Sequence, residues 1–227
     1  MEGITKQQAD IIGEVANICT GNAATALSMI INRPTNITTP LVEVLENEES
    51  LVQPDHILVK VPYTKGLDGT NLMILKEQDA LIIANLMMGG NGDPTGMAFD
   101  EITLSAISEA MNQMCGRIAT SMSEILHKPT DIGFPLINSK YKTTFVIPDE
   151  LCNGSDIVKV TFRLTVDGLI NSTIWQLYPL SIVKQILDQE GIYNGTENFS
   201  SRRCSVHEND AQRYPYKRWL RSMWRSS

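Results

Sequence analysis

The chain of 227 residues carries one long pattern twice, and this repeat constrains its fold more than any other feature. The windows 10–40 and 105–135 align without a gap. The identical pairs include Glu14/Glu109, Asn17/Asn112, Gly21/Gly116, Ala24/Ala119, Thr25/Thr120, Ser28/Ser123, Ile30/Ile125, Pro34/Pro129, Thr35/Thr130, Ile37/Ile132 and Pro40/Pro135. Such a match indicates an internal duplication, so we expect both copies to share one local structure.

Each copy is predicted to begin with a long helix that has one polar stripe. At 3.6 residues per turn, spacings of four, three and four residues place four side chains on one narrow face. These are Asp10, Glu14, Asn17 and Gly21 in the first copy and Ser105, Glu109, Asn112 and Gly116 in the second. The opposite, apolar arcs are Ile11, Ile12, Val15, Ile18, Cys19 and Ala26, then Ile107, Met111, Met114, Ile118, Met122 and Ile125. Amphipathic helices bury the apolar arc, so Glu14, Asn17, Glu109 and Asn112 are predicted to be exposed.

Local signals set the ends of both helices. Thr5 and Asp100 are N-cap candidates, and Gln8 completes a capping box with Thr5. Each helix should end before its Arg-Pro or Lys-Pro pair, at Pro34 and Pro129.

The remaining segments predict an α+β fold in which each unit is a long helix, three strands and a short helix. The expected strands are 41–45, 57–63 and 70–75, then 143–147, 157–165 and 170–177, with short helices at 77–88 and 180–188. Short turns favour an antiparallel sheet, and the duplication predicts pseudo-twofold symmetry. We expect one domain over 1–190, with repeats at about 5–90 and 100–188 joined by the linker 89–96. The tail 191–227 is expected to be disordered.

Composition excludes several classes of protein. A net charge of −7 argues against a nucleic-acid partner. No transmembrane segment or signal peptide is found in the sequence, so we expect a cytoplasmic location. Four scattered cysteines, Cys19, Cys115, Cys152 and Cys204, have no paired spacing and predict neither a disulfide nor a zinc site.

Among the catalytic motifs, the cysteine-phosphatase loop, the Gly-x-Ser-x-Gly elbow and His-Glu-x-x-His are all missing from the sequence. None of His56, His127 and His207 is a convincing base. An Asn amide both donates and accepts hydrogen bonds, so it can orient a water toward phosphorus without being its base. One exposed Glu-x-x-Asn is usually solvated surface, whereas its duplication favours a contact surface.

The repeated Asp/Ser-x-x-x-Glu-x-x-Asn with its distant proline resembles the CheC/CheX/FliY phosphatases, which hydrolyse the aspartyl phosphate of the chemotaxis response regulator CheY. The resemblance implies that Glu14 and Glu109 contact the regulator and that Asn17 and Asn112 orient the attacking water. Asp10, Gly21, Ser105 and Gly116 would contact the same partner. It further implies no cofactor or metal of the chain's own, since CheY supplies magnesium.

Within the family, residues 104–116 and 84–90 look most like the FliY branch, which implies flagellar motor-switch partners and a location at the basal-body switch. Members of that branch usually continue into a FliN-like domain, which this sequence does not contain. A truncated or frame-shifted FliY chain, a free-standing CheC-like phosphatase and a non-catalytic CheY-binding scaffold all stay open, as does which site is active.

Overall fold

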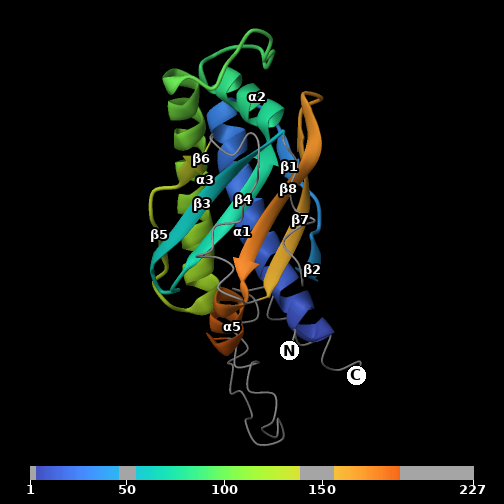
Figure 1. The fold of residues 1–227 in the computed structure, drawn as a ribbon, viewed down its shortest axis with the longest axis vertical. Coiled ribbons are helices and arrows are strands. Elements are labelled where there is room, and N and C mark those ends of the chain that lie inside the picture. The colour runs from blue at the N-terminus through green and yellow to red at the C-terminus, as the bar shows by residue number, and fades with distance from the viewer. Residues whose placement is uncertain (1–3, 46–54, 139–155, 190–227) are drawn as a thin grey trace, which may run out of the picture. The chain divides into compact units, whose positions relative to one another are not determined.

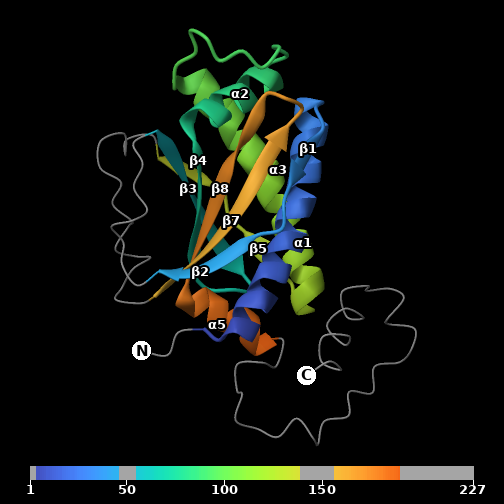
Figure 2. The same cartoon turned by 90° about the vertical axis from the view of Figure 1, so that its right-hand side faces the viewer.

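The computed structural model describes residues 4–45, 55–138 and 156–189, which form two layers (Figures 1 and 2). The helices are α1 (Lys6–Ile31), α2 (Glu77–Met87), α3 (Glu101–Leu126) and α5 (Leu180–Gln189). The strands are β1 (Thr35–Ile37), β2 (Leu41–Leu45), β3 (His56–Lys65), β4 (Thr70–Lys76), β5 (Asp131–Ile132), β6 (Leu136–Asn138), β7 (Ile157–Val166) and β8 (Ile170–Pro179). The helices α1 and α3 pack against each other on one face of the sheet. The predicted α+β class with an antiparallel sheet is confirmed.

Both long helices begin at their predicted caps. The Thr5 backbone donates to Gln8 Oε1 at 2.8 Å and the Gln8 backbone donates to Thr5 Oγ1 at 3.3 Å, which is the expected capping box. Asp100 Oδ1 accepts from the Thr103 backbone at 2.8 Å. The helices end at Asn32 and His127, each left-handed with φ of 51°, directly before the predicted Arg-Pro and Lys-Pro pairs.

The sheet interleaves the two halves of the chain. Its strand order is β1-β7-β8-β4-β3-β5, with β2 also on β7 and β6 also on β3. The first short strands of each half therefore pair with a long strand of the other half. The registers correspond too: Ile37 lies opposite Leu164 and its counterpart Ile132 opposite Tyr63. The element order and these pairings fit the expected pseudo-twofold relation between the halves.

Among the described residues, each half contributes four strands, whereas three were expected in each half. The strands that were not predicted are β1 and β5, which have three and two residues, and β6, which has three. The second half also forms β6 at Leu136–Asn138, in the place that β2 holds in the first half. The strand expected at 143–147 and the tail at 191–227 lie outside the described residues.

The main core lies between the sheet and the two long helices. All residues of the predicted apolar arcs are buried except Ile18, which is half-buried, and all the buried ones except Ala26 belong to this core. Alternation along the strands gives the sheet a second apolar face, which includes Leu58, Leu72 and Leu177. Two polar contacts fix α1 relative to its neighbours: Asn22 Nδ2 donates to Ser121 Oγ at 2.8 Å, and Gln176 Nε2 donates to Thr20 Oγ1 at 3.3 Å.

Candidate functional site

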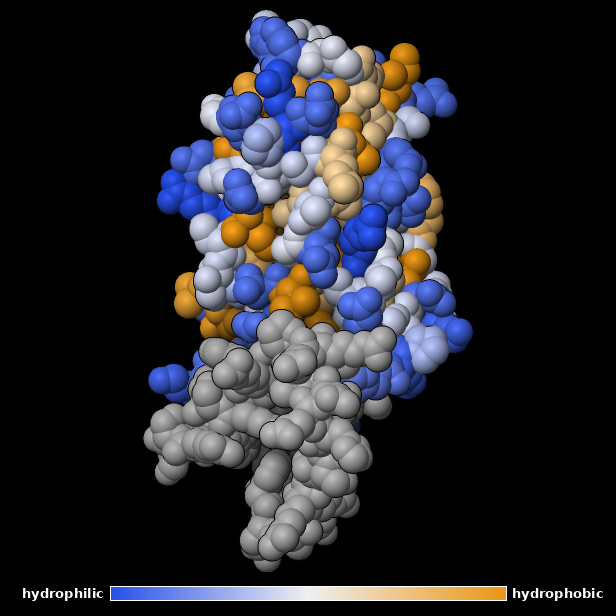
Figure 3. Space-filling model, turned by 180° about the vertical axis from the view of Figure 1, so that it is seen from behind, coloured by the Kyte–Doolittle hydropathy of each residue, from blue (hydrophilic) through white to orange (hydrophobic). Residues whose placement is uncertain are grey.

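The structure places the two predicted polar stripes on the sides of α1 and α3 that face away from the sheet. Glu109 is exposed, whereas Glu14, Asn17 and Asn112 are half-buried. The expected full exposure therefore holds for Glu109 and is too strong for the other three, which lie where the exposed face meets the buried arc. Neither asparagine amide has a hydrogen-bond partner within the described part of the chain. The space-filling view from this side shows hydrophilic side chains intermixed with hydrophobic ones, several of them at the hydrophobic end of the colour scale (Figure 3).

Other polar residues repeated in both halves have local structural roles. Thr25 Oγ1 donates to the Gly21 carbonyl at 3.1 Å, and Thr120 Oγ1 donates to the Gly116 carbonyl at 2.9 Å. These hydrogen bonds within each helix explain why the threonines are repeated. The repeated asparagines have no comparable bond to any residue that the structure describes, and Asn is a poor helix former. Their presence in both halves is therefore better explained by an external partner.

Serines repeated one turn farther along secure the ends of both helices. Ser28 Oγ donates to the Arg33 carbonyl at 2.7 Å. Ser123 Oγ donates to the Ala119 carbonyl and accepts from the Thr130 backbone, both at 2.8 Å. These bonds satisfy backbone groups where each helix turns into its next strand.

The glycines of the stripes are not required by internal packing. A Cβ added at Gly21 or Gly116 would meet no atom within 4 Å. By contrast, a Cβ at Gly13 would lie 3.2 Å from Val42 Cγ2. A glycine inside a helix lowers its stability by about 1 kcal/mol relative to alanine. At Gly21 and Gly116 no close internal contact requires a glycine. They leave the backbone open to close approach from outside.

The two sites differ in how their glutamates are held. Gln113 Nε2 donates to Glu109 Oε1 at 2.7 Å. The equivalent position in α1 is Ile18, which cannot donate, and Glu14 has no hydrogen-bond partner among the described residues. Asp10 and Ser105, which open the two stripes, are both exposed. The second site thus has a fixed carboxylate, while the first has two exposed or half-exposed carboxylates, Asp10 and Glu14, one turn apart.

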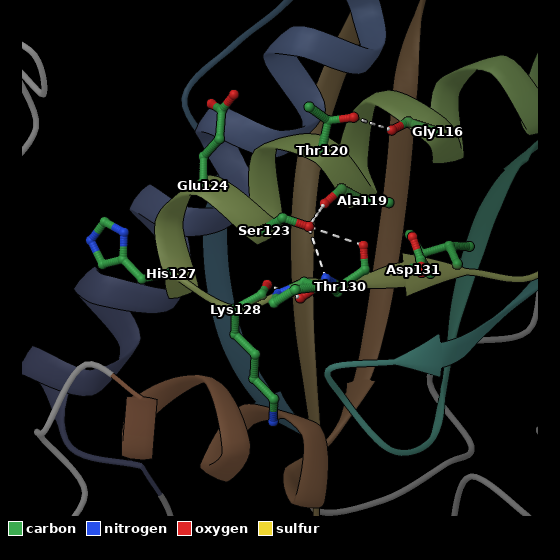
Figure 4. Close-up of a pocket in the computed structure, with 11 residues that line it drawn as sticks. Gly116, Ala119, Thr120, Ser123, Glu124, His127, Lys128, Thr130 and Asp131 are labelled. Carbon is green, nitrogen blue, oxygen red and sulfur yellow. Dashed lines mark hydrogen bonds between the residues drawn. The ribbon is translucent and has the colours of Figure 1, made fainter.

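A hollow of about 630 Å³ extends the second stripe beyond Gly116 (Figure 4). It lies between the last turns of α3 and β5. Its lining residues are Gly116, Ala119, Thr120, Ser123, Glu124, His127, Lys128, Pro129, Thr130, Asp131 and Ile132. This hollow was not predicted from the sequence. The signal was nevertheless present, because the repeat continues past the stripe through several of these residues.

Other reactive side chains of the described region lie in structural settings. Cys19 and Cys115 are free thiols, and burial raises the pKa of each to about 12, so neither is a thiolate nucleophile near neutral pH. The His56 ring is buried and stacks on Trp175 with centroids 5.0 Å apart. Cys152, Cys204 and His207 lie outside the described residues. Among the helices that the structure describes, none has the length and apolar character needed to cross a bilayer.

Comparison with known proteins matches the same segments. The model of the CheC-like family covers residues 8–44 and 102–133, which contain all eight stripe residues. The flagellar motor switch phosphatase FliY of Bacillus subtilis (strain 168) is 41% identical over 194 residues, which are 82% of this chain and 50% of that protein. The chain thus spans about half the length of that relative.

Solved structures share the fold. The crystal structure of Thermotoga maritima FliY has a TM-score of 0.74 and 37% identity, covering 85% of this chain and 100% of that one. The FliM middle domain from H. pylori has a TM-score of 0.64 at 14% identity, covering 82% and 99% of the two chains. At that identity the second likeness concerns the fold alone.

Proposed function

Because the chain belongs to the CheC-like family, we propose that it is a phosphatase that hydrolyses the aspartyl phosphate of the chemotaxis response regulator CheY. The observation that carries the proposal is the pair of asparagines, Asn17 and Asn112, which occupy the same helical position in both halves and have no hydrogen-bond partner among the described residues. Both lie in the segments that match the CheC-like family. The B. subtilis relative, which is named a flagellar motor switch phosphatase, supports the same reaction class.

The proposed mechanism assigns one task to each residue of a site. The asparagine amide accepts a hydrogen bond from a water and holds it in line with the phosphorus, while the attacking and leaving oxygens stay roughly collinear. Phosphoryl transfer depends mainly on positioning and on neutralising charge, so no base of the chain's own is needed. Magnesium and the phosphorylated aspartate belong to CheY.

The glutamates and glycines would hold the regulator in place. Glu14 and Glu109 lie one turn before the asparagines, where a carboxylate can pair with a basic side chain of CheY. Gly21 and Gly116 lie one turn after them and let the partner approach the helix backbone closely. Asp10 and Ser105 extend the contact at the other end. Each stripe thus forms a complete contact surface on one helix.

We further propose that the protein acts at the flagellar motor switch. The support is the name of the B. subtilis relative and the share of this chain that it covers. A free-standing CheC-like phosphatase would carry out the same reaction away from the switch. Pull-down of switch proteins by the chain, followed by mass spectrometry, separates these two possibilities.

A non-catalytic scaffold that only binds CheY is the second candidate. It is favoured by the fold shared with FliM, which has also been crystallised in a FliG–FliM complex from H. pylori. Measuring phosphate release from phosphorylated CheY with and without the chain decides between the candidates. Accelerated release supports the phosphatase, whereas binding without acceleration supports the scaffold.

A further inference from the structure

The hollow beyond Gly116 is continuous with the second proposed site. Helical spacing extends the stripe from Gly116 to Thr120, Ser123 and His127, all of which line the hollow. Gly116 itself belongs to both surfaces. A protein seated over Glu109 and Asn112 that continues along α3 must therefore pass over the hollow.

The hollow has a floor common to both halves and a rim specific to the second. The floor residues Gly116, Ala119, Thr120, Ser123, Pro129, Thr130 and Ile132 are identical to their counterparts in the first half. The rim residues Glu124, His127, Lys128 and Asp131 replace Met29, Asn32, Arg33 and Asn36. Two carboxylates thus replace a thioether and an amide. The two halves therefore share the residues of the floor but differ in the charge of the rim.

Three charged side chains of this rim, Glu124, Lys128 and Asp131, form no ion pair within the described residues. In the first half, Arg33 is paired with Asp167 at 3.6 Å. Within the described residues, its counterpart Lys128 forms no ion pair, and neither do Glu124 and Asp131. All three are exposed. The Ser123 and Thr130 hydrogen bonds fix the floor beneath them, as Figure 4 shows.

We propose that this hollow, with Glu124 and Asp131 on its rim, is a docking groove for the same response regulator whose phosphoryl group Asn112 addresses. The occupant is a segment of the regulator that presents basic side chains to the two carboxylates. The groove increases the affinity of the second site alone, because the first half has Met29 and Asn36 at these positions. This inference rests on the proposed function for the identity of the partner.

The test uses the full chain carrying Asn17→Ala, so that only the second site turns over. Glu124→Lys with Asp131→Lys reverses the two rim charges. The matched control adds the same lysines at the equivalent positions of the first half, Met29→Lys with Asn36→Lys. Circular dichroism verifies folding, and Glu124→Lys alone serves as a milder variant. The readouts are the Kd for CheY trapped with beryllofluoride, and KM and kcat for phosphate release, each at low and high salt.

The rim reversal should raise Kd and KM about tenfold with kcat unchanged, and the effect should shrink at high salt, because rim charges act mainly on association. The control should bind like the parent chain. Unchanged Kd and KM, or an equal change in the control, would refute the proposal that the hollow is a docking groove. If the parent binds CheY but releases no phosphate, turnover at the second site is refuted. The comparison of Kd values then still decides whether the hollow is a docking groove.

Discussion

Glu14 and Glu109 should both contribute to CheY binding, although the structure holds the two carboxylates differently. Gln113 already orients Glu109, so that carboxylate loses less rotational freedom on binding than Glu14 does. Glu109→Ala and Glu14→Ala should each raise the Kd for phosphorylated CheY at their own site by roughly 3- to 10-fold, because a carboxylate meeting a basic group contributes in the ground state.

Measuring these affinities at low and high salt tests the electrostatic origin of the effect. The loss caused by either substitution should shrink as salt is raised, since solvent-exposed charges are screened. Gln113→Ile, which copies the first half, is the matched control and should weaken binding less than Glu109→Ala. A salt-independent loss would refute an ion pair with the partner.

Asp79 gives the fold a pH dependence that is separate from the sites. Burial raises the pKa of this carboxyl above 3.8, although the hydrogen bond from Ser172 partly opposes the shift. The folded chain then holds the proton more tightly than the unfolded chain. Its contribution to stability is complete below pH 3.8 and is lost as pH rises through the folded-state pKa.

Asp79→Asn should therefore be less stable relative to the parent at acidic pH than at neutral pH. Denaturant unfolding from pH 3 to 7 measures the difference in free energy of unfolding, which should shift in favour of the variant as pH increases. Asp93→Asn is a control of opposite sign, because hydrogen bonds from Thr95 lower the pKa of Asp93. A difference for Asp79→Asn that is constant with pH contradicts the assignment.

At the residue scale, the sequence predicts the site residues but not their environment. The repeat identifies Glu14, Asn17, Glu109 and Asn112, since a duplicated polar pattern on one helix face needs no tertiary information. The bond from Gln113 to Glu109 depends on side-chain rotamers, and the partial burial of Asn17 depends on neighbouring packing. Neither can be read from helical spacing.

The helices α1 and α3 carry glycines whose replacement should separate function from stability. Gly21→Ala and Gly116→Ala each add a methyl group in open space, and alanine is the better helix former. Each should raise the free energy of unfolding by about 0.5–1 kcal/mol. At the same time, each should weaken CheY binding at its own site, because the methyl group projects into the partner's position.

Thermal unfolding and calorimetric binding measure the two opposite effects. Gly13→Ala on the buried side is the control: its Cβ would lie 3.2 Å from Val42 Cγ2, so it should gain less stability than the stripe substitutions, and it does not touch the stripe. If Gly21→Ala and Gly116→Ala gain stability but bind CheY normally, the glycines do not lie in the interface.

Among the elements, those with local signals were predicted well. Capping residues and Pro34 and Pro129 fix the ends of α1 and α3, and continuous or alternating apolar residues mark β3, β4, β7 and β8. The strands β1, β5 and β6 were missed because they have only three, two and three residues. They exist through pairing with β7 and β3 of the other half, which no local pattern encodes.

At the scale of the whole molecule, the exchanged strand pairs make each half depend on the other. β3 is flanked by β5 and β6, and β7 by β1 and β2, while β4 and β8 join the halves at the centre of the sheet. If the chain is divided into two polypeptides within the linker 89–96, each half should be unfolded alone, and the two should fold when mixed. Far-ultraviolet circular dichroism and gel filtration test this, and a half that unfolds cooperatively by itself contradicts it.

The repeat predicted two related halves, yet the exchange between them follows only from long-range pairing. The groove beyond Gly116 likewise requires α3 and β5 to meet, and β5 was not predicted. Superposing residues 6–45 on 101–138 in an experimental structure would test the pseudo-twofold relation. Different packing of the two helices on the sheet would contradict it.

The central claim is that Asn17 and Asn112 orient the attacking water. Phosphate release from phosphorylated CheY, measured with the parent chain, each single Asn→Ala variant and the double variant, tests it most directly, with binding followed in parallel. Each single variant should lose the activity of its own site, and the double variant should fall at least about 100-fold while Kd changes little, because a transition-state contact is lost without a ground-state one. A double variant that retains full activity would refute catalysis by these residues and leave a CheY-binding scaffold.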